Sequence, residues 1–162
     1  MFFNVVACGS PTKTFTAFRG ASPGKDARRT LLVDSERPAQ SKARSHLQEG
    51  EGWNLSFATD GEIHLMVETM ESWIIADTAA LANFYGSGFL PGALPDAENL
   101  ESVGKTEIAK GFDNATRNSS MKKYHKIQHA SELLKLIDPA PVQSRCPSAR
   151  RFFEEVTKAI TA

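Results

Sequence analysis

The chain has 162 residues, the usual length of one domain, and folding buries enough surface for a chain this long to be stable without covalent cross-links. Its 19 Lys and Arg residues balance 19 Asp and Glu residues, which argues against a strongly basic nucleic-acid coat protein and against a polyanion, although a local basic patch fits this balance. An apolar content of 41%, with 10 Phe and 2 Trp, excludes wholesale disorder.

The first half of the chain alternates strand-like and helical segments. Ser10 followed by Pro11 is typical of a helix N-cap and first helical position, and the helix that they open is expected to end near Gly20. A short second helix fits the charged connection around residues 41–47. Three apolar segments rich in β-branched or aromatic residues predict buried strands: residues 2–7, 30–33 and 63–67.

The second half of the chain has the apolar spacing of helices. Asp77 lies inside the first of them and is interpreted as a solvated or ion-paired residue. Gly111 weakens a second helix, and Pro139 with Pro141 ends a third. A Gly- and Pro-rich loop follows the first helix over residues 85–95. The predicted helices cover residues 71–84, 106–114, 129–137 and 148–160.

This order of elements predicts an α/β fold. Strands separated by helical segments favour a small, mainly parallel sheet with flanking helices over residues 1–85. The helices that follow favour a mostly helical C-terminal cap over residues 86–162. The whole chain, residues 1–162, is expected to form a single domain.

Targeting and redox signals are weak. The apolar runs are far shorter than the roughly 20 residues that span a bilayer, and residues 1–8 lack the basic start of a signal peptide. Cys8 and Cys146 lie far apart and have no metal-type spacing. A cytoplasmic protein with free thiols and no membrane segment is therefore expected.

Acidic residues follow two of the predicted strands. Asp34 and Glu36 come directly after residues 31–33, Glu68 follows the next strand, and Glu71 lies one helical turn later. Ligands of open α/β sheets bind at the carboxyl ends of strands, and Mg²⁺ or Mn²⁺ takes carboxylate ligands. Helix capping explains each acid taken singly as well or better. Asp34 with Glu36 is the strongest pair because no convincing helix begins there.

A basic segment lies between two of the predicted helices. Its Lys and Arg side chains could hold phosphates, its tyrosine could stack on a base, and His125 could act as a general acid or base. On composition alone, a solvated loop that leads into the helix at residue 129 is the favoured interpretation. The nucleic-acid-binding candidates are Arg117, Lys122, Lys123, Tyr124 and Lys126.

The sequence resembles the domain-of-unknown-function family 4276 over nearly its whole length. The similar segments are residues 4–18, 31–38, 64–77, 83–94, 123–129, 137–139 and 146–153. That family resembles the Toprim fold of topoisomerases, primases and OLD-type nucleases, a small parallel sheet with acidic metal ligands at its strand ends. The resemblance implies a Mg²⁺-binding role for Asp34 and Glu36, in the place of the Toprim Asp-x-Asp pair, and makes Glu68 and Glu71 candidates for the same site.

The chain departs from the Toprim pattern at its start. Toprim-like chains open with an apolar strand that ends in a glutamate, whereas residues 2–7 match the family's second strand and no upstream glutamate precedes them. In Toprim chemistry that glutamate is the proposed general acid/base or metal ligand. The expectation is a chain that lacks the first β-α unit of its family.

Two classes of function follow. The first is a Toprim-like nuclease module in which Asp34, Glu36 and Glu68 hold Mg²⁺ or Mn²⁺ and the basic segment meets nucleic acid; family members often resemble partners of an ATPase encoded nearby, in a mobile-element or phage-defence setting. The alternative is a non-catalytic interaction or regulatory partner of an ATPase, or a truncated, inactive family member. A nucleotide-binding enzyme that uses His125 is disfavoured because the glycines lack phosphate-loop spacing.

Overall fold

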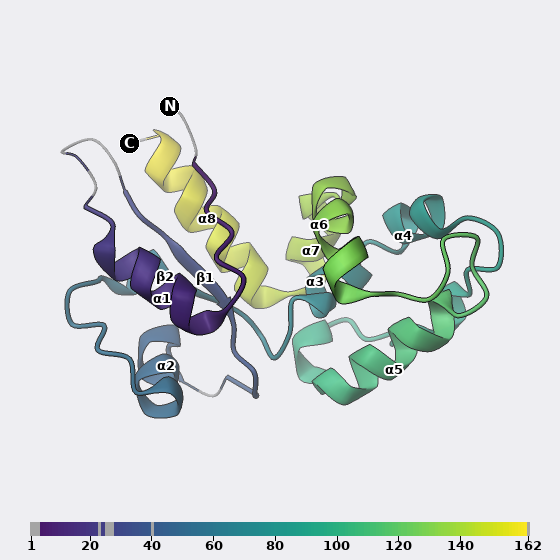
Figure 1. The fold of residues 1–162 in the computed structure, drawn as a ribbon, viewed down its shortest axis with the longest axis horizontal. Coiled ribbons are helices and arrows are strands. Elements are labelled where there is room, and N and C mark those ends of the chain that lie inside the picture. The colour runs from purple at the N-terminus through teal and green to yellow at the C-terminus, as the bar shows by residue number, and fades with distance from the viewer. Residues whose placement is uncertain (1–3, 23, 25–27, 40, 162) are drawn as a thin grey trace.

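The computed structural model describes residues 4–22, 24, 28–39 and 41–161. Figure 1 shows a sheet part, formed by the chain up to the second strand together with the last helix, beside a part made of helices. The expected α/β class with a small parallel sheet is confirmed. The elements are α1 Pro11–Gly20, β1 Leu31–Asp34, α2 Ala43–Glu51, η1 Asp60–Glu62, β2 Ile63–Met66, α3 Glu71–Ala76, α4 Thr78–Tyr85, η2 Pro91–Ala93, η3 Leu100–Ser102, α5 Lys105–Thr116, α6 Lys126–Leu136, α7 Pro139–Arg145 and α8 Pro147–Thr161.

The two strands β1 and β2 pair in parallel, with Leu31 opposite Ile63 and Asp34 opposite Met66. Leu31 and Val33 alternate with less buried neighbours along β1, as expected for a strand with one face on a core. That core also takes side chains from α1, α2 and β2. The register brings the carboxyl ends of both strands to the same edge of the sheet.

The helical part is organised around α3, whose six residues are all buried. A second hydrophobic cluster surrounds it, with side chains from α4, α5, α6 and α7. Phe112 and Tyr85 are 1% and 0% exposed, and their rings meet edge to face with centroids 6.1 Å apart. This packing holds α5 and α6 at the edge of the sheet where the strands end.

Helix α8 joins the two parts. Its Phe152 ring lies 5.3 Å from the ring of His64 on β2 and 5.9 Å from the ring of Trp73 on α3. Figure 1 shows α8 running along the sheet part, with its first turn next to the helical part. The position of α3 relative to the strands therefore depends on the last helix of the chain.

Glu101 of η3 caps the first turn of α8. Its carboxylate accepts the Ser148 N–H at 2.9 and 3.1 Å and also the Ser148 hydroxyl. Glu101→Ala should lower the free energy of unfolding by about 1 kcal/mol, because an N-terminal helix donor loses its partner. Glu101→Gln, which keeps one acceptor oxygen, should lose less. Urea denaturation of the three chains measures both; an unchanged midpoint in Glu101→Ala would contradict the capping role.

Several predicted elements were wrong. Residues 4–7 of the predicted buried strand 2–7 are exposed and outside any strand, because no neighbouring strand pairs with them; residues 2–3 lie outside the described residues. Asp77 divides the predicted helix 71–84: it is buried, not solvated, and caps α4 by accepting the Ala80 N–H at 3.0 Å. Helix α6 does end before Pro139, as expected. Pro139 is also the first residue of α7, a helix that the sequence periodicity did not predict.

Gly111 has a packing role that explains its place inside α5. A Cβ atom there would lie 2.7 Å from Pro95 Cδ and 3.0 Å from the Ala93 carbonyl oxygen. The absence of a side chain lets η2 approach α5 closely.

Cys8 and Cys146 are both free thiols, and the helices of the described residues include none long and apolar enough to cross a membrane. Division of the chain at residue 85, within one domain, stays a prediction.

Candidate functional site

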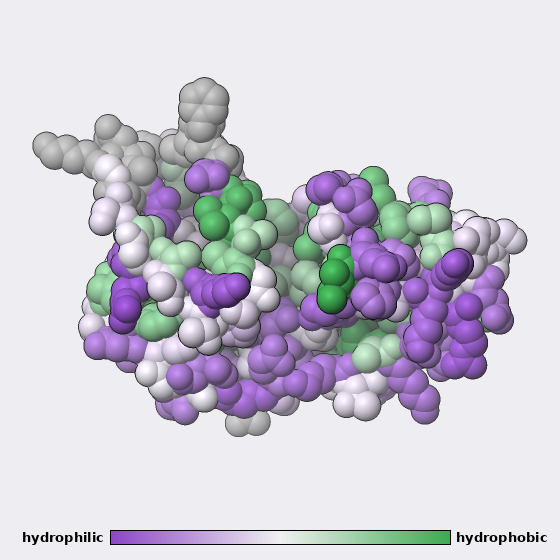
Figure 2. All heavy atoms as spheres, viewed as in Figure 1, coloured by the Kyte–Doolittle hydropathy of each residue, from purple (hydrophilic) through white to green (hydrophobic). Residues whose placement is uncertain are grey.

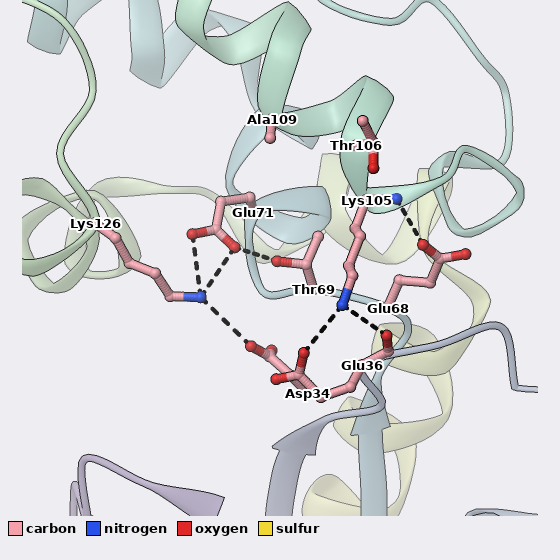
Figure 3. A pocket seen from close by; sticks show the side chains of 9 residues that line it. All are labelled: Asp34, Glu36, Glu68, Thr69, Glu71, Lys105, Thr106, Ala109 and Lys126. Atoms are coloured by element: carbon pink, nitrogen blue, oxygen red, sulfur yellow. Dashed lines mark hydrogen bonds and ion pairs between the residues drawn. The ribbon is translucent and has the colours of Figure 1, made fainter.

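A cavity of about 440 Å³ lies beyond the carboxyl ends of the two strands. Its walls come from the strand ends and from the first turns of α3, α5 and α6, as Figure 3 shows. Four carboxylates and two ammonium groups share it, so its formal charge is negative. The lining residues are Asp34, Glu36, Glu68, Thr69, Glu71, Lys105, Thr106, Ala109 and Lys126.

Beyond the end of each strand lies a glutamate with left-handed backbone: φ is +59° at Glu36, after β1, and +55° at Glu68, after β2. Such values are uncommon outside glycine, and residues that adopt them concentrate at functional sites. The two turns are tied together, because the Glu36 N–H donates to the Glu68 carbonyl oxygen at 3.2 Å and the Glu68 N–H donates to Ser35 Oγ at 2.7 Å. The paired turns direct acidic side chains from two strands into one cavity.

Lys126 lies between two of the carboxylates. Its Nζ atom is 3.5 Å from Asp34 Oδ2 and 3.3 Å from both carboxylate oxygens of Glu71. The Glu71 side chain is 9% exposed, whereas that of Lys126 is 54% exposed. An ammonium group thus reaches in from the solvent side and bridges acids from β1 and α3 (Figure 3).

Glu71 is held from the protein side as well. Its carboxylate accepts the Thr69 hydroxyl, and it accepts the Tyr124 hydroxyl at 2.8 Å. The Tyr124 ring in turn stacks on Phe112, with centroids 4.1 Å apart. Three donors and a stacked aromatic ring fix the orientation of this carboxylate, a degree of preorganisation that a binding site requires.

A second lysine serves the other two acids. The Nζ atom of Lys105 lies 3.3 Å from Glu36 Oε2 and 2.9 Å from the Glu36 carbonyl oxygen. The Lys105 N–H, at the N-terminus of α5, donates to Glu68 Oε2 at 2.6 Å. The four acids therefore form two pairs, Asp34 with Glu71 and Glu36 with Glu68, and each pair has its own lysine.

The electrostatics differ between the two buried acids. Burial raises the pKa of Asp34 above its ordinary value, and the charge of Lys126 offsets this only in part. Burial also acts on Glu71, but the Thr69 hydroxyl, Lys126 and the Tyr124 hydroxyl outweigh it and lower the pKa of Glu71. Burial would lower the pKa of Lys126, yet its two carboxylate neighbours raise it, which keeps this lysine charged.

The donors fit a hard divalent cation in kind. All four acids offer carboxylate oxygens, and Asp34 Oδ1 is buried without a hydrogen bond of normal geometry. Their arrangement is not that of a formed metal site: within residues 4–22, 24, 28–39 and 41–161, no three His, Cys, Asp or Glu side chains are grouped closely enough to hold a metal ion. Ammonium groups stand at the carboxylates instead.

The structure separates the predicted acids from most of the predicted basic residues. Arg117 and Lys123 pair with Asp113, at 3.7 and 2.5 Å, near the end of α5 opposite the cavity, and Lys122 is exposed at φ +65°. His125 is exposed and donates its backbone N–H to His129 Nδ1, so the cavity does not include it. The twelve residues of α5 span about 18 Å, which accounts for the separation.

Tyr124 and Lys126 do contribute to the cavity, in ways that differ from the prediction. The Tyr124 ring is half-buried and stacks on Phe112, and a role in stacking on a base stays a prediction. Sequence analysis missed Lys105 and Thr69. The position of Lys105 just before the predicted helix 106–114 could have indicated its role. No local pattern indicates Thr69, because its role depends on a contact with Glu71.

The chain matches one known domain family. Residues 8–157 fit the family described as "Domain of unknown function (DUF4276)", which is most of the chain. The chain belongs to the DUF4276 family. No curated protein and no solved structure matches it. Membership of DUF4276 confirms the family named from the sequence, and it assigns no activity.

Proposed function

We propose that this DUF4276 chain is a Toprim-like, divalent-metal-dependent module that processes nucleic acid. The observation that carries the proposal is the cavity at the strand ends. Four carboxylates meet two lysines there, and they come from β1, from α3 and from the turns that follow the two strands. Carboxylates at this edge suit Mg²⁺ or Mn²⁺, and the lysines suit a phosphate. Bound metal would supply polarisation of the phosphate and an activated water.

This chain's own residues would divide the work. Asp34, whose buried Oδ1 atom accepts no hydrogen bond of normal geometry, is the first candidate to bind the cation, and the remaining acids complete its carboxylate surroundings. Lys105 is half exposed at the rim and is suited to contact a phosphate oxygen that enters the cavity. The more distant Arg117, Lys122 and Lys123 would contact the nucleic-acid backbone farther out.

Isothermal titration with MgCl2 and MnCl2 tests the metal step. Wild type should bind, and Asp34→Asn should bind at least about tenfold more weakly because one anionic ligand is lost. Asn keeps the size and shape of the Asp34 side chain, so the variant should fold. Asp96→Asn removes an exposed acid outside the cavity and should bind like wild type.

Cleavage of single- and double-stranded DNA and RNA, with and without MnCl2, tests the reaction. Metal-dependent cleavage that Asp34→Asn abolishes would support the nuclease. Absence of metal binding by wild type, or equal binding by wild type and Asp34→Asn, would exclude it.

A second candidate is a non-catalytic partner of an ATPase. It is favoured by one observation: among the described residues, a lysine already stands beside each pair of acids and no ready-made metal group exists. In that case the chain would co-purify with an ATPase encoded nearby and would show no metal-dependent cleavage. The mobile-element or phage-defence setting belongs to both candidates.

A further inference from the structure

We infer that Lys126 is a built-in competitor for the cation, and that the cation position of this cavity lies between Asp34 and Glu71. The inference deepens the proposed function and rests on it. It names the pair of acids that would hold the metal, and it makes a lysine of the same chain the group that the metal must displace.

The ammonium group of Lys126 occupies the place of a cation. It lies within 3.5 Å of three carboxylate oxygens that come from two elements of the fold. Glu71 is held in place by Thr69 and Tyr124 without the help of Lys126, so the acid would keep its orientation when the lysine leaves. Asp34 retains a buried oxygen that accepts no hydrogen bond of normal geometry.

Lys126 is also able to leave. It is the first residue of α6, and its side chain is about half exposed, so a change of rotamer can carry its ammonium group into solvent without unpacking the core. The other pair of acids is less suitable. Glu68 accepts the backbone N–H of Lys105, which cannot move away unless α5 itself shifts, and Glu36 is exposed.

The test compares Lys126→Met with wild type in thermal unfolding and in titration with MgCl2 and MnCl2. Met keeps the length of the side chain and removes its charge. Without metal, Lys126→Met should melt at a lower temperature, because Asp34 and Glu71 lose their shared counter-charge. In the titrations, Lys126→Met should bind the metal ion at least about tenfold more tightly than wild type, since a positive charge no longer competes for the same oxygens.

Two matched variants isolate the effect. Lys126→Arg keeps the charge and should bind metal no more tightly than wild type. Lys135→Met removes another lysine of α6, one that pairs with Glu132 outside the cavity, and should leave metal affinity unchanged. Glu71→Gln in the Lys126→Met background should reverse the gain in affinity, whereas Glu36→Gln should not.

The outcomes separate the two proposals. If wild type binds metal and Lys126→Met binds equally or more weakly, the competition is wrong while the metal site stands. A gain that depends on Glu36 instead of Glu71 overturns the assigned pair. If neither chain binds metal, the proposed function fails and this inference with it. Tight binding by Lys126→Met alone supports the competition by the lysine, whereas the metal-dependent activity proposed for the wild-type chain then fails.

Discussion

Phe112→Ala should lower the free energy of unfolding by about 4 kcal/mol, the largest effect expected of any substitution considered for this chain. The ring is 1% exposed, stacks on Tyr124 at 4.1 Å and meets Tyr85 edge to face. Removing the Phe112 ring leaves a cavity. The neighbouring rings of Tyr85 and Tyr124 belong to different elements, and they cannot both move in to fill it. Urea denaturation followed by fluorescence measures the loss.

The same substitution should disturb the cavity at the strand ends, because Phe112 supports the ring whose hydroxyl donates to Glu71. Phe112→Leu keeps most of the volume and should lose no more than about 1.5 kcal/mol. Phe57→Ala serves as the control, since that ring is 38% exposed and outside this cluster. A Phe112→Ala chain as stable as Phe57→Ala would show that the stacked pair does not hold the helical part together.

Glu71→Ala should lower the free energy of unfolding by about 2 kcal/mol near neutral pH. The substitution leaves the Thr69 and Tyr124 hydroxyls without their acceptor and removes one carboxylate from Lys126. The loss stays below that of a fully buried pair because the lysine is half exposed and can turn to water. Glu71→Gln keeps one acceptor oxygen and should lose about half as much.

The effect of Glu71 should depend on pH in a definite direction. Its pKa in the folded chain lies below the ordinary value of 4.5, so its contribution is present above that value and is lost as the pH falls through the folded pKa. The difference between wild type and Glu71→Ala should therefore shrink below about pH 4.5. Glu132→Ala, which breaks an exposed pair with Lys135, should cost at most about 0.5 kcal/mol at any pH; a Glu71→Ala effect equally small would contradict a structural role for its network.

Local sequence patterns were enough to predict an element where the composition of the segment itself indicates a strand or a helix cap. The apolar β-branched runs at residues 30–33 and 63–67 correspond to β1 and β2, and Ser10 caps α1 as its position before Pro11 indicates. The same kind of reasoning failed at residues 4–7, which have strand composition but meet no partner strand. A strand needs a neighbour for its backbone hydrogen bonds, and composition does not supply one.

The candidate site shows the same division. The position of Asp34, Glu36 and Glu68 directly after strands was enough to predict that they share one edge, because parallel strands in register end together. Proximity in sequence was misleading for the basic segment. Of its cationic residues only Lys126 lines the cavity, since α5 carries Arg117 and Lys123 to its far end.

By itself, the sequence determined the α/β class, the family and the acids at the strand ends, since each of these depends on order and spacing along the chain. The tertiary structure alone decided which groups face those acids. Lys105 comes from the start of α5, Lys126 from the start of α6, and Tyr124 from the loop between these helices. The contacts of Tyr124 and Lys126 with Glu71 and of Lys105 with Glu36 join residues 53 to 69 positions apart, and packing around α3 and Phe112 brings them together.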